Sequence, residues 1–126
     1  MDLLSTIQAP ISTELVELNR ILVEKLQTNN ALINSIVDRY LRTKGKQLRP
    51  MLILLCAKMV GNISDKTILS AVAIELMHNA SLIHDDVVDN SPLRRGQPTI
   101  NALEDNRLAV LMGDYFVSCA LKCGVE

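Results

Sequence analysis

Apolar residues recur every three or four positions through the first third of the chain. Between Pro10 and Gln27 they fall at Ile11, Leu15, Leu18, Leu22 and Leu26. Between Ala31 and Arg42 they fall at Leu32, Ile36, Val37 and Tyr40. This spacing places side chains along one face of a helix, so we expect two amphipathic helices here. Gly45 is the C-cap that we expect for the second helix.

A denser apolar run, Met51–Val60, follows the basic segment Gly45–Pro50. Pro50 fits the first turn of a helix because its missing N–H would have no partner there. Gly61 then ends this predicted helix.

Ser64 offers an N-cap for a longer helix, which we expect to run toward Asp89. The part of this helix from Lys66 to Met77 is apolar on most faces. Such a helix has to be covered on several sides, so we place it at the centre of a helix bundle.

Residues 90–98 are rich in turn formers, including Pro92 and Gly96, and we expect a loop there. A short helix over Thr99–Asp105 and a longer one over Arg107–Cys123 follow. The longer helix is expected to turn one set of side chains inward, namely Leu108, Leu111, Met112, Tyr115, Phe116 and Cys119. No convincing alternation of apolar and polar residues predicts a strand.

The composition agrees with a fold made of helices. Hydrophobic residues make up 48% of the 126 residues, yet the chain has only two Tyr, one Phe and no Trp. The remaining hydrophobic residues are mostly Leu, Ile, Val, Ala and Met, which favour helix-on-helix packing over a β-sandwich. We therefore predict an all-α helix bundle.

Charge and targeting signals limit the partners and the cellular location that we expect for the protein. A net charge of -1 gives the chain no general attraction for nucleic acid. No stretch reaches the roughly 18 uncharged apolar residues of a membrane span, and the N-terminus has no basic signal-peptide region. Cys56, Cys119 and Cys123 lack the spacing of a disulfide framework, so we interpret them as free thiols. We expect a cytoplasmic protein without a transmembrane segment.

Three acids, Asp85, Asp86 and Asp89, close the long predicted helix. A helix C-terminus disfavours each carboxylate by roughly 0.3–1 kcal/mol unless a positive partner is near. Asp85 and Asp89 stand one turn apart with His78 on the same stripe, and two carboxylates at this spacing suit Mg²⁺. Asp86 points about 100° away and is assigned to supporting the metal ligands or holding the loop. His78 and His84 each have a second interpretation as a satisfied core histidine, which is favoured for His84.

Basic residues lie on both sides of these acids in the sequence. Arg94 and Arg95 follow them, while Lys46 and Arg49 lie beside the N-terminus of the helix that contains Pro50. Cations near free backbone N–H groups suit a ligand with more than one phosphate. Simpler interpretations are that Lys46 and Arg49 form a solvated turn, and that Arg94 and Arg95 form ion pairs with the acids.

Four motifs, in this order, resemble those of one enzyme family. They are GKQLRP at Gly45–Pro50, a Glu75-x-x-His78 segment leading into HDDVVD at residues 84–89, RRGQPT at 94–99 with Asn101, and GDY at 113–115. Together they resemble the first half of a trans-isoprenyl (polyprenyl) diphosphate synthase. The resemblance covers residues 45–115.

The resemblance implies an active site inside a helix bundle and a head-to-tail prenyl transfer. An allylic diphosphate held through Mg²⁺ ionises to a carbocation, isopentenyl diphosphate attacks it, and a proton is lost. Asp85 and Asp89 would bind Mg²⁺, with Asp86 in the same catalytic group, and Arg94 would contact the allylic diphosphate. Isopentenyl diphosphate would bind to Lys46, Arg49, His78 and Arg95.

The resemblance also bears on product length, because in this family the growing chain descends beside the helix that precedes the acids. Ala80 and Ser81 stand at the positions where bulky side chains would block it. Both are small, so we expect a long-chain polyprenyl product of the quinone side-chain type.

Members of the family carry a second aspartate-rich motif far downstream, which these 126 residues do not contain. We therefore expect residues 1–126 to be the N-terminal part of a larger all-helical domain and to be inactive alone. Within it, we expect N-terminal helices over 10–44 and a substrate- and metal-binding half over 45–126. The apolar excess on the helices favours a homodimer.

Two other interpretations stay open. HD-type metal phosphohydrolases also use His and Asp ligands, but they need more histidines than the two in this chain. A non-catalytic helical subunit of a heteromeric prenyl synthase would share the fold, although it has no electrostatic reason to keep the acids and arginines together.

Overall fold

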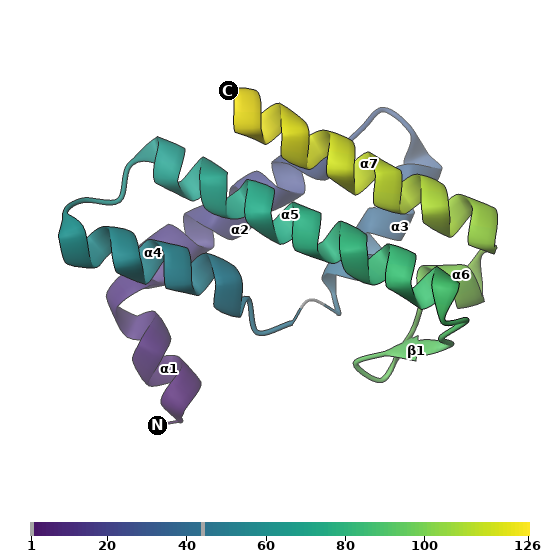
Figure 1. Ribbon diagram of the computed structural model, residues 1–126, viewed down its shortest axis with the longest axis horizontal. Coiled ribbons are helices and arrows are strands. Elements are labelled where there is room, and N and C mark those ends of the chain that lie inside the picture. The colour runs from purple at the N-terminus through teal and green to yellow at the C-terminus, as the bar shows by residue number, and fades with distance from the viewer. Residues whose placement is uncertain (1, 44) are drawn as a thin grey trace.

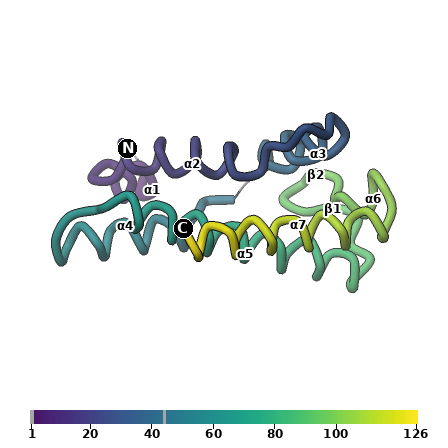
Figure 2. The backbone as a smooth tube through the Cα atoms, turned by 90° about the horizontal axis from the view of Figure 1, so that it is seen from above, coloured from purple at the N-terminus to yellow at the C-terminus, as the bar shows by residue number. Residues whose placement is uncertain are grey.

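The computed structural model describes residues 2–43 and 45–126, which form helices in two layers (Figures 1 and 2). One layer holds α2 (Ser12–Leu26) and α3 (Ala31–Leu41). The other holds α4 (Leu48–Val60), α5 (Asp65–Val88) and α7 (Asn106–Val125). The predicted all-α fold is confirmed.

The N-terminal segment contains one helix more than the apolar spacing predicted. α1 (Leu3–Gln8) is followed by a 3-10 turn, η1 (Ala9–Ile11), which contains Pro10. Asp2 caps α1, because its Oδ1 accepts a hydrogen bond from the Ser5 N–H at 2.7 Å. No residue of α1 is buried, so no apolar face marked this helix in the sequence.

α5 lies between α4 and α7 in its layer, with α2 behind it (Figure 1). Ser64 is the predicted N-cap, and its side chain accepts a hydrogen bond from the Thr67 N–H at 3.2 Å. The buried apolar positions of α5 are Ile68, Ala71, Val72, Leu76, Ala80 and Ile83. Ile74 and Met77, in contrast, are 47% and 40% exposed. Within the described residues, the central helix is therefore covered on every side but one.

α7 packs along α5 through a face that contains Ala109, Met112, Phe116, Cys119 and Cys123. The prediction that Leu111 points inward was wrong, since Leu111 is 56% exposed. It lies about 100° around the helix from Met112, which takes the inner position. The Tyr115 hydroxyl donates to the Leu26 carbonyl at 2.8 Å and ties α7 to α2.

α7 is the one helix in the described part of the chain that is long and apolar enough to cross a membrane. An 18-residue window of α7 has a mean hydropathy of 1.5, and 39% of that window is buried within the fold. A helix in a protein core meets the same criterion. Because α7 packs along α5, its apolar residues are needed for the bundle in any case.

The segment predicted to be a loop contains a small antiparallel hairpin, so the prediction of no strand was wrong. β1 (Leu93–Arg94) pairs with β2 (Gln97–Pro98). The two turn residues between the strands, Arg95 and Gly96, have φ values of 53° and 77°. Two successive positive φ values are the requirement of a type I′ turn. Glycine is a known signal for that turn, whereas arginine rarely adopts positive φ.

The connection from α3 to α4 differs from the prediction at one residue. α3 ends at Leu41 with Arg42 as its C-cap, so Gly45 is not the cap of that helix. α4 begins at Leu48, which leaves Pro50 in the first turn as predicted. The predicted boundary between 10–44 and 45–126 falls beside residue 44, which lies outside the described residues.

The short helix after the hairpin is α6 (Ile100–Leu103), within the predicted range 99–105. Thr99 is its N-cap and accepts a hydrogen bond from the Ala102 N–H at 3.2 Å. The Thr99 hydroxyl also donates to the Ser91 carbonyl at 2.7 Å. This bond fixes the hairpin against the end of α5.

Candidate functional site

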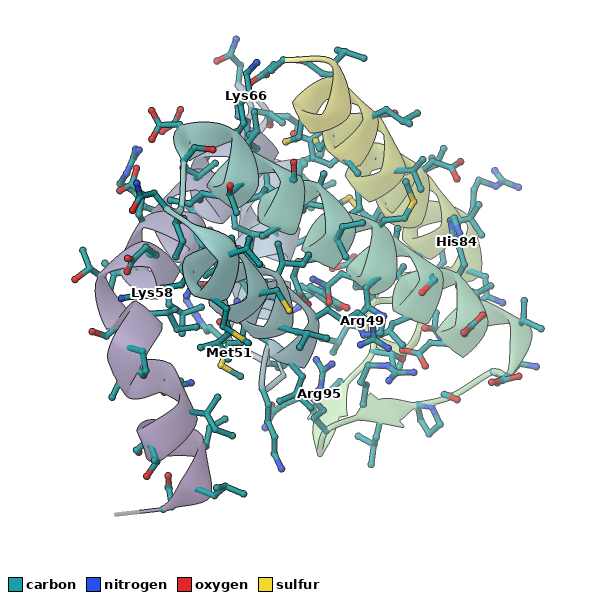
Figure 3. All side chains as sticks on the ribbon, turned by 60° about the vertical axis from the view of Figure 1, so that its left-hand side comes forward. Arg49, Met51, Lys58, Lys66, His84 and Arg95 are labelled. Atoms are coloured by element: carbon teal, nitrogen blue, oxygen red, sulfur yellow. The ribbon has the colours of Figure 1, made fainter. Side chains whose placement is uncertain are left out.

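Four residues with a predicted role in binding line one cavity of about 360 Å³. Lys46 and Arg49 come from the start of α4, His78 comes from α5, and Arg95 comes from the β1–β2 turn. Figure 3 shows Arg49 and Arg95 near one another beside the hairpin. Three separate segments of the sequence therefore meet at one cavity, and two of them bring side-chain cations to it.

The first turn of α4 opens onto this cavity without a side-chain cap. Gln47 is the N-cap residue, with φ 59° and ψ 39°, and its side chain makes no capping hydrogen bond. The N-terminal end of a helix carries partial positive charge and free backbone N–H groups. Together with Lys46 and Arg49, this end of α4 favours an anion.

His78 is held by one of the cavity arginines. Arg49 Nη1 donates to His78 Nε2 at 3.0 Å, so the imidazole accepts at Nε2. Burial lowers the pKa of His78, and the nearby charges of Arg49, Arg95 and Arg94 lower it further. The imidazole is therefore neutral near pH 7 and fixes the guanidinium without neutralising it.

Glu75 also lines the cavity, although the sequence reasoning gave it no role. Its side chain is on α5, three residues before His78, and Glu75 is only 7% exposed. Burial raises the pKa of Glu75, while the charges of Arg49 and Arg95 oppose that rise. The i,i+3 spacing to His78 was the signal that placed both residues on one helix face.

Arg95 links the hairpin to the connection between α3 and α4. Its Nη1 donates to the Thr43 carbonyl at 2.9 Å. A Cβ added at Gly45 would lie 2.8 Å from Arg95 Nη2, closer than real side chains approach. Gly45 therefore leaves the room that the Arg95 guanidinium occupies.

Asp86 and Arg94 form an ion pair with two hydrogen bonds. Arg94 Nε and Nη2 donate to Asp86 Oδ2 and Oδ1, both at 2.8 Å. Asp86 is only 5% exposed, and its hydrogen bonds raise the pKa of Arg94. The structure thus places Asp86 in the role of holding the hairpin to the end of α5. The contact of Arg94 with an allylic diphosphate stays a prediction.

Asp85 and Asp89 are exposed, and the described residues offer their side chains no ion pair or hydrogen bond. The Asp89 N–H donates to the Asp85 carbonyl at 2.9 Å, so the helical register continues to Asp89 and keeps both carboxylates on one face. Across residues 2–43 and 45–126, no three His, Cys, Asp or Glu side chains converge on a metal position. Two free carboxylates fit Mg²⁺, which commonly takes one or two and completes its shell with water and phosphate oxygens.

His84 faces α7 (Figure 3). Its Nε2 lies 3.2 Å from the Val110 carbonyl and 3.2 Å from Asp114 Oδ1. A Cβ added at Gly113 would lie 2.3 Å from His84 Nε2, so the ring occupies the space beside that glycine. These contacts satisfy the His84 side chain, but it is 35% exposed and lies at the edge of the α5–α7 contact, not in the core. They leave the HD-type metal site without its second histidine.

The two positions predicted to set product length differ in exposure. Ala80 is fully buried in the core of the bundle. Ser81 is exposed, and its hydroxyl donates to the His78 carbonyl at 2.7 Å. Ser81 is therefore the one of the pair at which a larger side chain could be accommodated without repacking the core.

Tyr40 is a further residue near the site that the sequence placed only on a helix face. It lines a small cavity together with Asp86 and Arg94. Its hydroxyl donates to Asn79 Oδ1 at 3.4 Å, and its ring meets that of Phe116 edge to face at 5.6 Å. Burial raises the pKa of Tyr40 to about 12, so it acts only as a neutral hydrogen-bond donor.

The fold and the site define a class of protein. It is an all-α protein in which cations gather at one helix N-terminus and free carboxylates stand at the end of a neighbouring helix. The chain belongs to the Polyprenyl synthetase family, whose sequence model matches residues 30–126. The predicted family is confirmed.

Relatives with known names agree with this assignment. The chain is 38% identical over 128 residues to an all-trans-nonaprenyl-diphosphate synthase (geranyl-diphosphate specific) of Rhodobacter capsulatus, covering 100% of this chain and 39% of that protein. It is 37% identical over 105 residues to heptaprenyl diphosphate synthase component 2 of Bacillus subtilis, covering 83% and 30%. The chain thus spans 39% or less of the length of these relatives.

A solved structure shares the fold. The polyprenyl synthase from Caulobacter crescentus CB15, complexed with calcium and isoprenyl diphosphate, superposes with a TM-score of 0.91 at 30% identity. The match covers 97% of this chain and 37% of that one. The described helices therefore have the arrangement of an isoprenoid synthase.

Proposed function

We propose that the chain forms the substrate-binding part of a Mg²⁺-dependent trans-prenyltransferase that condenses an allylic diphosphate with isopentenyl diphosphate. The observation that carries this proposal is the single cavity lined by Lys46, Arg49, His78 and Arg95. The relatives named above support it, because their names are those of polyprenyl diphosphate synthases.

The cavity is assigned to isopentenyl diphosphate. His78 engages Nη1 of Arg49, and the Thr43 carbonyl engages Nη1 of Arg95. Each guanidinium therefore keeps other N–H groups for phosphate oxygens while its position is fixed. Fixed donors of this kind lose little freedom when the anion binds.

The allylic diphosphate is assigned to the end of α5. Asp85 and Asp89 would supply carboxylate oxygens to Mg²⁺, which, when bound, neutralises charge on the diphosphate leaving group. Arg94 is held beside these acids by Asp86. In the proposed reaction the allylic C–O bond breaks as diphosphate leaves, a C–C bond forms to isopentenyl diphosphate, and a proton is lost.

A long-chain product of the quinone side-chain type is part of the proposal. Ala80 and Ser81, five and four residues before Asp85, have small side chains that would not block the growing chain. The nonaprenyl and heptaprenyl synthases among the relatives are named for long products.

A second candidate function follows from one of these relatives. The similarity to a protein named component 2 favours a subunit of a two-component synthase over a homodimer. Light scattering of the protein as its gene encodes it, with and without a second polypeptide, would measure the subunit mass. A homodimer with turnover on its own would exclude this alternative.

Titration calorimetry of the protein as its gene encodes it tests the proposed binding. Isopentenyl diphosphate should bind without Mg²⁺, and Arg49→Gln should weaken that binding by roughly tenfold or more, because it removes a charged donor. Geranyl diphosphate should bind only with Mg²⁺, and Asp85→Asn should abolish that dependence.

Two matched variants control for loss of charge alone. Arg107→Gln removes an exposed arginine at the start of α7, and Asp65→Asn removes a carboxylate at the opposite end of α5. Both should leave the two affinities unchanged. Absence of heat with either diphosphate, or equal losses in the control variants, would contradict the proposed function.

A further inference from the structure

Asn19 and Gln47 form a closed pair of amide hydrogen bonds between the two layers. Gln47 Nε2 donates to Asn19 Oδ1 at 2.7 Å, and Asn19 Nδ2 donates to Gln47 Oε1 at 3.3 Å. Asn19 Nδ2 also donates to the Leu15 carbonyl at 3.0 Å. The bond to the Leu15 carbonyl fixes the Asn19 amide on α2, so the amide pair connects Gln47 to a rigid helix.

Gln47 needs such a connection because of its backbone conformation. Its φ of 59° and ψ of 39° lie in the left-handed region, which residues other than Gly, Asn and Asp rarely adopt. Its carbonyl accepts the Met51 N–H at 3.1 Å and so begins the hydrogen bonding of α4. A change of φ at Gln47 would therefore turn Lys46 relative to the first turn of α4.

We infer that Asn19 is a positioning residue for the diphosphate cavity. It holds Gln47 in the left-handed conformation, and Gln47 in turn directs Lys46 and the uncapped N-terminus of α4 toward the same ligand. The inference rests on the proposed function, because it names a residue that prepares the proposed isopentenyl diphosphate site. Asn19 lies outside residues 30–126, which match the family, so the match itself gives it no role.

A purely structural role for Asn19 makes a different prediction. If the amide pair only joined the two layers, its loss would lower the free energy of unfolding and leave the affinity of the folded chain unchanged. If it positions the cavity, the affinity falls and the geometry of Gln47 changes in the chain that remains folded. The two roles are therefore separated by measurements on folded protein.

The experiment compares the protein as its gene encodes it with its variants Asn19→Ala and the exchanged pair Asn19→Gln/Gln47→Asn. The exchanged pair keeps both amides and the combined length of the two side chains, and Asn tolerates left-handed φ. Calorimetry with isopentenyl diphosphate should show about fivefold weaker binding for Asn19→Ala, the effect of one lost hydrogen bond, and recovery to within about twofold in the exchanged pair. The backbone coupling of residue 47 in NMR spectra, which reports φ, should change in Asn19→Ala alone.

Asn34→Ala is the matched control. Asn34 Nδ2 donates to the Thr28 carbonyl at 2.8 Å, so this variant also removes an anchored asparagine amide, but at the start of α3 and away from the cavity. It should leave the affinity unchanged. Unaltered binding by Asn19→Ala, or an equal loss in Asn34→Ala, overturns the inference while the proposed function stands. A wild-type chain that binds no diphosphate overturns the proposed function, and the inference with it.

Discussion

The arginines of the site differ in what balances their charge. Arg49 and Arg95 donate to neutral acceptors, the His78 imidazole and the Thr43 carbonyl. Arg94 donates to the carboxylate of Asp86. A neutral acceptor orients a guanidinium and leaves its charge available for an anion, whereas a carboxylate cancels most of that charge. The cavity cations are therefore prepared for ligand binding, and Arg94 first serves to hold the hairpin.

The first prediction concerns the two parallel hydrogen bonds between Arg94 and Asp86. Arg94→Lys keeps the charge but cannot make two parallel bonds to Asp86. We expect the free energy of unfolding to fall by roughly 1–3 kcal/mol, since a buried carboxylate loses one of its partners. Urea unfolding followed by circular dichroism measures this change.

Arg39→Lys is the control for that substitution. Arg39 forms an ion pair with Glu104 through one distance of 3.2 Å, from Nη2 to Oε1, and both side chains are partly exposed. Its replacement should change the free energy of unfolding by less than about 0.5 kcal/mol. Equal effects at the two positions would show that the paired geometry at Asp86 contributes nothing.

The second prediction concerns the titration of His78. Its pKa lies below the ordinary value of about 6.5 because of burial and the neighbouring arginines. A lowered pKa in the folded state means that the neutral form stabilises the fold. That contribution is complete above about pH 6.5 and is lost as the pH falls through the lower folded value. Bound diphosphate brings negative charge and should raise the pKa of His78 again.

NMR titration of the imidazole protons measures both values, and His78→Gln identifies the signal of His78. A His78 pKa at or above 6.5 in the free chain would show that the arginines do not act on it. An unchanged pKa on addition of isopentenyl diphosphate would place the ligand elsewhere.

At the scale of elements, the contact between α5 and α7 depends on a missing side chain. The His84 ring occupies the space where a Cβ of Gly113 would lie, 2.3 Å from Nε2. Both residues lie within helices, so neither backbone can move alone. An added Cβ at position 113 would therefore force the His84 ring out of its place beside Val110 and Asp114.

The third prediction follows from this contact. Gly113→Ala should lower the free energy of unfolding by about 1–3 kcal/mol, the usual cost of overpacking a core, despite the better helix propensity of alanine. Adding His84→Ala should recover most of the loss. Gly124→Ala, on the same helix with nothing within 4 Å of its added Cβ, should instead gain about 0.5–1 kcal/mol. Thermal unfolding of the variants decides between these outcomes, and a neutral Gly113→Ala would contradict the account.

Periodicity in the sequence was enough to predict most of the elements. α2, α3, α5 and α7 carry apolar faces, and Ser64 marks the start of α5. α1 escaped prediction because it buries nothing, and the hairpin escaped because Arg95 adopts a conformation that its residue type does not signal. The outward position of Leu111 depends on how α7 is rotated against α5, which spacing leaves undetermined.

The candidate site, like the fold, was predicted in part from the sequence, and the rest depends on how the elements pack together. The family resemblance grouped Lys46, Arg49, His78 and Arg95, and these residues line one cavity, while their role in binding stays a prediction. The interpretation that the arginines form ion pairs with the acids is confirmed for Arg94, but spacing did not indicate that Asp86 is its partner or that Glu75 is buried. The Asp86–Arg94 pair depends on how the hairpin folds back onto the end of α5, and Glu75 lies in the cavity to which α4 and the hairpin contribute.

On the scale of the whole molecule, the candidate site residues lie on one side of the bundle. The start of α4, the C-terminal half of α5 and the hairpin meet there, while α2 lies in the other layer (Figures 1 and 2). A prenyl chain attached to a diphosphate near Asp85 would extend along α5 past Ser81. In the proposed function, product length would therefore depend on the residues that line this path.

The fourth prediction tests this path. Ser81→Phe places a large ring on the exposed turn before Asp85, and we expect it to shorten the polyprenyl product. The assay is chromatography of dephosphorylated products made by the protein as its gene encodes it. Ala80→Phe is less informative, because Ala80 is fully buried and the larger ring would disrupt packing.

Ser118→Phe is the matched control for Ser81→Phe. Ser118 is an exposed serine on α7, outside the proposed path. The control should give the wild-type product length. A wild-type product from Ser81→Phe would remove the chain-length role of this turn.

The left-handed residues beside the cavity have a consequence for any selection based on heat resistance. Gln47 and Arg95 both hold φ values above 50°, where glycine or asparagine is favoured by about 1 kcal/mol. A mutant library screened only for survival at high temperature would enrich such replacements at both positions. The surviving variants would be more heat-resistant, yet they would lack the Gln47 amide and the Arg95 cation. Directed evolution of this chain therefore needs a selection for binding in every round, because selection for heat resistance alone would remove the residues of the site.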